Sequence, residues 1–155
     1  MKAKIRDTEI YFDVDGAQLV ADGARLVERP VTFVLHGGPG VDHSGYKPVL
    51  SPLTAHTQLV YVDHRGQGRS QRGAKETYTL SNNVEDLDAL REYLGLEKIN
   101  ILGASYGGMV AMSYAVAYPD RVSDLIALVT ASDCRFIQRA KEILKVRGSK
   151  EQRRA

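Results

Sequence analysis

The chain has little cysteine and no long apolar run. Cys134 is the single cysteine among 155 residues, so no internal disulfide can form, and an oxidising compartment is not indicated. A membrane-spanning helix needs roughly 18 consecutive apolar residues, but the apolar window 109–118 stops at Pro119. The basic start of the chain, residues 1–10, lacks the apolar run of a signal peptide. We therefore expect a cytoplasmic protein without a membrane partner.

The net charge is small but unevenly distributed. Hydrophobic residues make up 43% and charged residues 26% of the chain, as in ordinary folded domains. Residues 1–133 carry 13 basic and 17 acidic side chains, whereas residues 134–155 carry 8 and 2. The basic segment lacks interleaved aromatic residues and places its apolar residues at helical spacing, so we expect no nucleic-acid partner. The histidines and the cysteine show no zinc spacing, and no dinucleotide fingerprint is present, so we expect no metal and no cofactor.

Short apolar runs alternate with helical patterns along the chain. Continuous apolar runs of four or five residues are typical of strands buried on both faces. Four such runs are found, at residues 31–35, 58–62, 99–102 and 125–129. Before them, residues 10–14 and 17–27 contain strand formers broken by glycines, which would fit two antiparallel edge strands.

Three segments have helical character. Residues 81–94 place apolar side chains three or four positions apart, and Gly95 provides a C-terminal stop. Residues 106–118 are small or apolar on every side and end at Pro119, while residues 136–148 form one amphipathic face. The alternation predicts an α/β fold, with a mostly parallel sheet and helices on both of its faces.

The sequence Gly103-Ala104-Ser105-Tyr106-Gly107 lies between a predicted strand and a predicted helix. Small flanking residues allow a sharp turn that holds a serine in a strained conformation with its hydroxyl exposed. The N-terminus of the following helix favours a developing negative charge. This position predicts a nucleophilic serine.

A glycine-rich loop, His36-Gly37-Gly38-Pro39-Gly40, follows the strand at 31–35. Such a loop leaves backbone N–H groups uncovered, and a hydrolase needs two of them aimed at the oxyanion. We assign this role to the N–H groups of Gly38 and Tyr106, with Gly37, Pro39 and Gly40 in loop support or substrate binding. For His36 itself we favour a packed, hydrogen-bonded histidine.

A third loop, residues 63–70 (DHRGQGRS), follows the strand at 58–62. It lacks the Gly-Lys-Ser/Thr end of a P-loop, so we interpret it as a turn that Asp63 and Arg65 brace against the neighbouring loop.

These three motifs, each after a strand and in this order, resemble the N-terminal part of an α/β-hydrolase-fold serine hydrolase of the proline iminopeptidase (prolyl aminopeptidase) type. The resemblance implies that Ser105 is the nucleophile of an acyl-enzyme reaction on an amide or ester, and that Gly38 and Tyr106 form the oxyanion hole. It also implies that residues 1–132 are the N-terminal part of the hydrolase core and that residues 133–155 begin a cap, with both units incomplete.

A serine nucleophile needs a histidine base and an acid, which follow the serine in this fold. All four histidines (His36, His43, His56 and His64) precede Ser105. The family histidine is therefore missing, and of the downstream aspartates only Asp133 lies where some relatives place the acid. The resemblance puts the acid one strand later, so Asp133 is the less favoured choice, and we prefer loop packing to a substitute base for His36, His43 and His64.

Three hypotheses stay open. The chain is part of an iminopeptidase-like enzyme that acts on a small molecule or short peptide, with a downstream segment or a second chain supplying Asp and His. Alternatively, it is a non-catalytic binding protein or inactive fragment of the same fold, or a carboxylesterase-type hydrolase. The resemblance implies further strands that this chain does not contain, so we also expect an exposed sheet edge.

Overall fold

The computed structural model describes residues 1–149 and 151. Its strands are β1 (Lys2–Ile5), β2 (Thr8–Asp15), β3 (Leu19–Asp22), β4 (Arg25–Glu28), β5 (Val31–Leu35), β6 (Gln58–Val62), β7 (Ile99–Ala104) and β8 (Val122–Leu128). Its helices are α1 (Lys47–Leu50), α2 (Leu80–Tyr93), α3 (Tyr106–Ala117) and α4 (Arg135–Arg147). Short 3₁₀ turns lie at His43–Gly45, Ser51–Ala55, Lys75–Thr77 and Pro119–Arg121.

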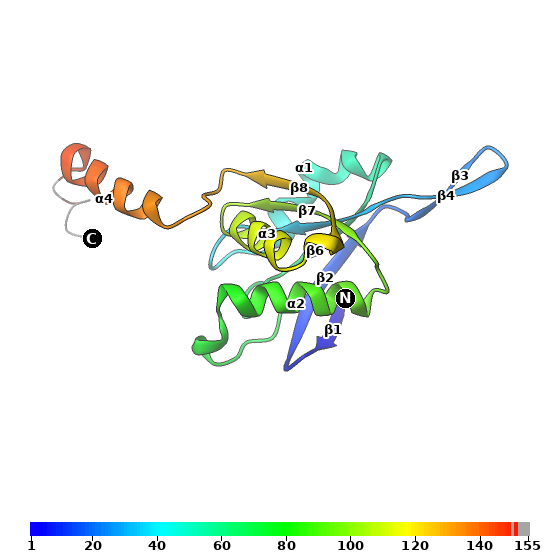
Figure 1. The fold of residues 1–155 in the computed structure, drawn as a ribbon, viewed down its shortest axis with the longest axis horizontal. Helices are drawn as coiled ribbons and strands as arrows, with labels where there is room; N and C mark the ends of the chain where they lie inside the picture. Colours follow the sequence, from blue (N-terminus) through cyan, green and yellow to red (C-terminus); the bar gives the residue numbers. More distant parts are fainter. Residues whose placement is uncertain (150, 152–155) are drawn as a thin grey trace.

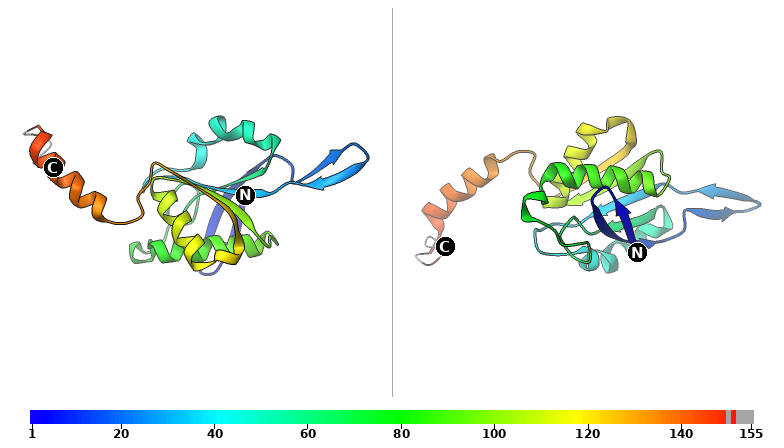
Figure 2. Two further views of the ribbon diagram at one scale, coloured as in Figure 1. Left: turned by 45° about the horizontal axis from the view of Figure 1, so that its top comes forward. Right: turned by 90° about the horizontal axis from the view of Figure 1, so that it is seen from below.

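Six strands form one mixed sheet in the order β1-β2-β6-β5-β7-β8. The pairs from β6 to β8 are parallel, and β1 and β2 add an antiparallel edge. Strands β5 and β6 have the same bounds as the strands predicted at 31–35 and 58–62. Parallel strands need crossover connections, and these connections contain the helices. Helices α2 and α3 pack on one face of the sheet, and α1 lies on the other (Figures 1 and 2).

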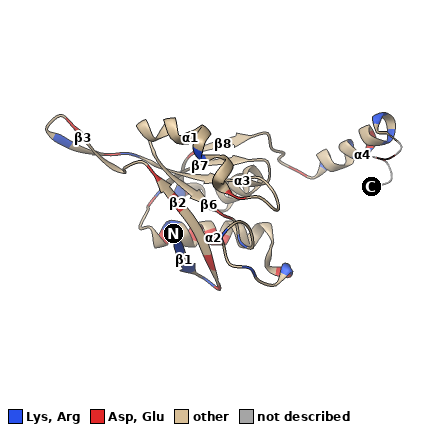
Figure 3. Cartoon of the chain, turned by 180° about the vertical axis from the view of Figure 1, so that it is seen from behind, with Lys and Arg blue, Asp and Glu red and all other residues tan. Residues whose placement is uncertain are grey.

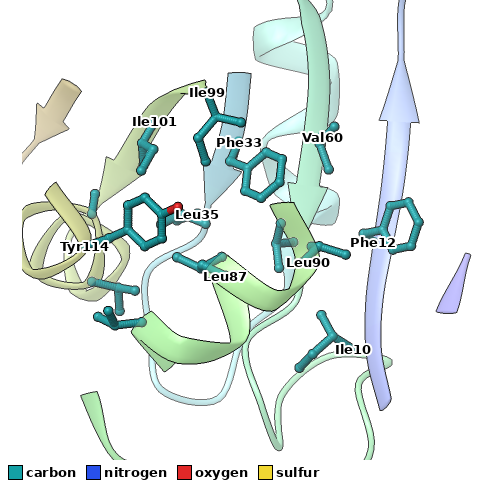
Figure 4. Close-up of a cluster of buried hydrophobic side chains, with 14 of the residues drawn as sticks. Ile10, Phe12, Phe33, Leu35, Val60, Leu87, Leu90, Ile99, Ile101 and Tyr114 are labelled. Atoms are coloured by element: carbon teal, nitrogen blue, oxygen red, sulfur yellow. The ribbon is translucent and has the colours of Figure 1, made fainter. Parts of the chain in front are cut away.

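The main core lies between the sheet and the pair α2 and α3 (Figure 4). Phe33, Leu90 and Ile101 are fully buried there. A smaller cluster on the opposite face joins Val34, Leu59, Tyr61 and Leu102 to the partly buried Tyr46 and Leu50. Both faces of β5 are therefore covered, as its continuous apolar sequence predicts. Gly95 ends α2 with a φ of 68°, and its N–H donates to the Glu92 carbonyl, which confirms the predicted stop.

Two sequence-based expectations need correction, and one strand lies outside the predicted ones. The hairpin β3–β4 is a separate two-stranded sheet that projects from the body, not an edge of the main sheet (Figures 1 and 2). Strand β1 was not predicted, although the alternation in Lys2–Ile5 gives it one buried face. The run at 125–129 is not buried on both faces, since β8 pairs only with β7 in the part of the chain that the structure describes, and Leu125, Ile126 and Leu128 are each 40% to 45% exposed.

Helix α4 stands away from the body (Figure 1), at the end opposite to the hairpin β3–β4. Its basic residues are distributed along the helix (Figure 3), and all of its side chains are exposed. The expected boundary between residues 132 and 133 falls in the connection between β8 and α4. The assignment of 133–155 to a cap stays a prediction, and residues 150 and 152–155 of it lie outside the described chain. No described helix has the length and apolar character of a membrane span.

Candidate active site

Ser105 lies at the turn between β7 and α3. Its backbone has φ 53° and ψ −119°, a region that L-residues rarely adopt, and its side chain is exposed. Three contacts hold this conformation in place. The Ser105 N–H donates to the Leu128 carbonyl at 3.0 Å, and the Ser105 carbonyl accepts from the Gly108 N–H at 3.0 Å and from the Thr130 hydroxyl at 2.7 Å. The turn therefore presents a serine hydroxyl at the carboxyl end of the parallel strands.

The glycines on both sides of the serine are required by close backbone contacts. A Cβ atom at Gly107 would lie 2.3 Å from the carbonyl oxygen of Leu35, and a Cβ atom at Gly103 would lie 2.3 Å from that of Gly107. Neither backbone oxygen can move aside without displacing the end of β5 or the first turn of α3. The G-x-S-x-G pattern is thus the sequence signal of a helix that starts directly against the neighbouring strand.

The glycine-rich loop at 36–40 lies against the serine. A Cβ atom at Gly37 would be 3.2 Å from the Ser105 Cβ. The Gly37 N–H donates to the Tyr46 hydroxyl at 3.1 Å, and the Gly40 N–H donates to Gln67 Oε1 at 3.0 Å. The Gly38–Pro39 bond is cis, and Gly38 has a φ of 133°.

The two N–H groups assigned to the oxyanion hole are available for a ligand. Within residues 1–149, neither the Gly38 N–H nor the Tyr106 N–H has a hydrogen-bond acceptor. Tyr106 is the first residue of α3, where N–H groups have no partner inside the helix. Free N–H donors and the positive end of a helix dipole are what an oxyanion hole requires. The assignment of these two groups to that role stays a prediction.

His36 is fully buried, as expected for a packed histidine. Its Nε2 accepts the backbone N–H of His64 at 3.2 Å, and its Nδ1 lies 2.5 Å from the Gly37 carbonyl. Accepting a backbone N–H requires an unprotonated Nε2, so the ring is neutral with its proton on Nδ1. Burial lowers the pKa of His36, and burial lowers the pKa of His64 to about 3.

The carboxylate of Asp63 joins the two loops. It is fully buried and accepts the His43 N–H at 3.0 Å, the His43 Nδ1–H at 2.8 Å and the Arg69 N–H at 2.8 Å. The predicted brace at Asp63 is therefore present. Arg65 braces a different neighbour, because its guanidinium binds Asp86 on α2 at 2.6 and 2.8 Å and Asp7 at 2.7 Å.

No described histidine forms a hydrogen bond with Ser105. His36, His43 and His64 are each 2% exposed or less and hold loop contacts, and the Ser105 hydroxyl has no hydrogen-bond partner among the described residues. Asp133 is partly exposed, and its carboxylate pairs with the Arg135 guanidinium and backbone N–H. The hydrogen-bonded ion pair with Arg135 lowers the pKa of Asp133, which favours the ionised carboxylate. Within the described chain, no group of three or more His, Cys, Asp or Glu side chains could hold a metal ion.

Sequence reasoning missed the side chains that support the glycine-rich loop. Tyr46 and Gln67 bind it from distant positions, and Asn83 on α2 donates to the Tyr106 hydroxyl at 2.9 Å. Tyr46 and Asn83 belong to no local motif, and Gln67 lies in the loop 63–70, where nothing in the sequence indicates this contact. The one available signal was the polar Asn83 next to the apolar Val84 in the face of α2 that packs on the sheet.

Comparison with known proteins places the chain in a family. Residues 30–146 match the model of the alpha/beta hydrolase fold. A proline iminopeptidase of Pestalotiopsis fici is 35% identical over 143 residues, which cover 90% of this chain and 50% of that protein. A protein of Caulobacter vibrioides named as a carbamate hydrolase is 32% identical over 115 residues, 74% of this chain and 42% of that one.

A solved structure shows the same likeness in three dimensions. The proline iminopeptidase-related protein of Thermus thermophilus superposes with a TM-score of 0.73 at 29% identity, covering 84% of this chain and 44% of that one. The chain thus spans about half the length of the relatives it matches, and it corresponds to their N-terminal part. The chain belongs to the alpha/beta hydrolase fold family.

Proposed function

We propose that this chain is the nucleophile-bearing part of a serine hydrolase of the proline iminopeptidase type. The observation that carries the proposal is the conformation of Ser105, which is exposed at φ 53° and ψ −119° between a buried strand and a helix, with the glycine-rich loop against its Cβ. A strained serine at this junction is the geometry of a nucleophile elbow.

In the proposed reaction, Ser105 Oγ attacks the carbonyl carbon of an amide or ester, and a base takes the hydroxyl proton. The tetrahedral oxyanion binds to the N–H groups of Gly38 and Tyr106. The carbon–nitrogen or carbon–oxygen bond then breaks, the proton goes to the departing amine or alcohol, and an acyl-enzyme forms on Ser105. Water hydrolyses this ester and regenerates the serine.

The base and the acid of this reaction come from polypeptide outside the chain. The buried histidines are committed to loop contacts, and Asp133 is paired with Arg135. The exposed edge of β8 offers a place where further strands of the sheet would pair, either from a downstream segment or from a second chain. Leu125, Ile126 and Leu128 would then be covered.

A fluorophosphonate probe tests the nucleophile. We expect it to label Ser105 in a form that carries the C-terminal half found in the relatives, and to label the 155-residue chain far more slowly, because unassisted serine is a weak nucleophile. Ser105→Ala should abolish labelling, whereas the matched control Ser113→Ala, on α3, should not affect it. Failure of the longer form to label at Ser105 would contradict the proposal and favour a non-catalytic protein of the same fold.

The substrate class needs a separate measurement, since relatives named as proline iminopeptidases and as a carbamate hydrolase both match. We expect the longer form to release naphthylamine from proline 2-naphthylamide. Hydrolysis of p-nitrophenyl acetate with no release of naphthylamine would favour the carboxylesterase alternative instead.

A further inference from the structure

A cavity of about 280 Å³ with several polar side chains in its lining lies beside the proposed oxyanion hole. It is bounded by the glycine-rich loop, the loop after β6 and the first residues of α2 and α3. Its volume is close to the lower end of the roughly 300–1,000 Å³ range of ligand sites. Side chains that line it are Pro39, Gln67, Arg72, Tyr78, Asn83 and Tyr106.

Asn83 lines this cavity and has an unpaired acceptor buried beneath its surface. Its side-chain nitrogen donates to the Thr79 carbonyl and to the Tyr106 hydroxyl, both at 2.9 Å. A carbonyl can only accept, so these bonds fix which end of the amide is the nitrogen. Oδ1 is left with no hydrogen-bond partner among the described residues, although Asn83 is only 3% exposed. Buried acceptors are nearly always paired, so this one indicates a missing donor.

Arg72 brings an unneutralised cation to the same cavity. Its guanidinium donates a hydrogen bond to the Ser70 carbonyl at 3.4 Å, and it forms no ion pair with a described carboxylate. Gln67 uses its Oε1 for the Gly40 N–H, which leaves its amide nitrogen free for a ligand. The cavity thus combines a cation and an amide donor with one acceptor.

We propose that this cavity binds a carboxylate that carries a neighbouring N–H group, as in a small amino acid or the C-terminal residue of a short peptide. The ligand carboxylate pairs with the Arg72 guanidinium and accepts from the Gln67 amide. The ligand N–H donates to Asn83 Oδ1, which a small shift of the surrounding side chains would uncover. This inference rests on the proposed function. In that reaction, the ligand is the part of a peptide that leaves when Ser105 is acylated.

Binding is measured by nitrogen-15 NMR on the Ser105→Ala chain, so that catalysis plays no part. We expect L-alanine to cause saturable shifts at Gln67 and Asn83, and we expect acetate and methylammonium, which each lack one group, to bind at least about tenfold more weakly. N-acetyl-L-alanine distinguishes the two sources of the ligand. If N-acetyl-L-alanine binds more tightly than L-alanine, the ligand is the end of a peptide, and if the two bind equally well, a free amino acid suffices.

Two variants test the assigned contacts. Arg72→Gln and Asn83→Leu should each weaken binding about tenfold or more. Lys75→Gln removes a nearby charge outside the cavity, and Asn100→Val removes another buried unpaired Oδ1 on β7, so both should bind like the parent. If Asn83→Leu does not fold, Arg72→Gln, on an exposed loop, still shows whether the cavity binds the ligand carboxylate.

Absence of saturable shifts, equal binding of acetate and L-alanine, or unchanged binding by Arg72→Gln would overturn the proposal. None of these outcomes bears on Ser105, whose role the fluorophosphonate labelling tests independently.

Discussion

His36 and His64 hold each other reciprocally. The His64 N–H donates to the His36 ring nitrogen at 3.2 Å, and the His64 ring Nε2 lies 3.0 Å from the His36 carbonyl. The two rings pack edge to face with centroids 4.5 Å apart. This pair joins the glycine-rich loop to the loop after β6. A second proton on the His36 ring would break its bond with the His64 N–H, and burial disfavours a charged His64 ring.

The pair makes stability depend on pH. Burial lowers the pKa of His64 to about 3 in the folded chain, against about 6.5 in the unfolded chain. The folded state therefore binds fewer protons in this window, so the stabilisation is complete above pH 6.5 and is lost as the pH falls toward 3. Between these two pKa values, each pH unit of acidification lowers the free energy of unfolding by about 1.4 kcal/mol for one histidine. We expect urea unfolding to show a loss of about 2 kcal/mol between pH 6.5 and 5.

The variant His64→Gln should flatten this dependence, because glutamine can still donate to the His36 carbonyl but does not titrate. His56→Gln, which changes an exposed histidine, is the matched control and should leave the slope unchanged. An equally steep slope in His64→Gln would assign the pH dependence to other groups.

A buried ion pair joins the loop after β6 to α2. Arg65 and Asp86 are 4% and 3% exposed, and two hydrogen bonds connect them. We expect Asp86→Ala to lower the free energy of unfolding by roughly 3–5 kcal/mol, because the guanidinium stays buried with only the exposed Asp7 as partner. Glu9→Ala breaks the exposed pair with Lys2 and should cost about 0–1 kcal/mol.

The double variant Arg65→Met with Asp86→Leu separates charge from packing. It should recover most of the loss seen in Asp86→Ala, since no unpaired charge stays buried. If urea unfolding finds the double variant as unstable as Asp86→Ala, the pair acts through its hydrogen-bond geometry rather than through charge compensation.

Local sequence predicts local structure well here. The run Val31–Leu35 predicts β5 because its apolar residues need cover on both faces, and the small residues around Ser105 predict the sharp turn. The run at 125–129 is at least as apolar, yet β8 is largely exposed, since burial depends on neighbours that the run itself does not encode. The contacts of Asp63 with His43 and of Gln67 with Gly40 span 20 and 27 positions, and no local pattern indicates such pairs.

The approach of α3 to β5 gives a sharp steric prediction. A methyl group at Gly107 would meet the Leu35 carbonyl oxygen at 2.3 Å, so Gly107→Ala must push the helix from the sheet. We expect a loss of roughly 1–3 kcal/mol in urea unfolding, the usual range for overpacking. Gly45→Ala, where the added methyl meets nothing within 4 Å, is the control and should be neutral or slightly stabilising. Equal stabilities for the two variants would show that α3 has room to move.

Strain at Ser105 predicts a substitution that stabilises the chain. The residue has φ 53° and ψ −119°, and its side chain makes no cap hydrogen bond. Glycine adopts this conformation freely, and strain of this kind costs about 1–3 kcal/mol. After the greater entropy of an unfolded glycine, about 0.5–1 kcal/mol, is subtracted, Ser105→Gly should still raise the free energy of unfolding by about 1 kcal/mol. Ser105→Ala keeps the Cβ atom and should gain almost nothing.

The residue before α2 provides the opposite case. Thr79 has an ordinary φ of −102°, and its hydroxyl accepts the Asn82 N–H. Thr79→Gly therefore removes a cap without relieving strain and should lower stability by a few tenths of a kcal/mol up to about 2 kcal/mol. If calorimetry shows Ser105→Gly destabilising the chain as Thr79→Gly does, the serine conformation is not strained, and the chief support for a nucleophile at this turn is lost.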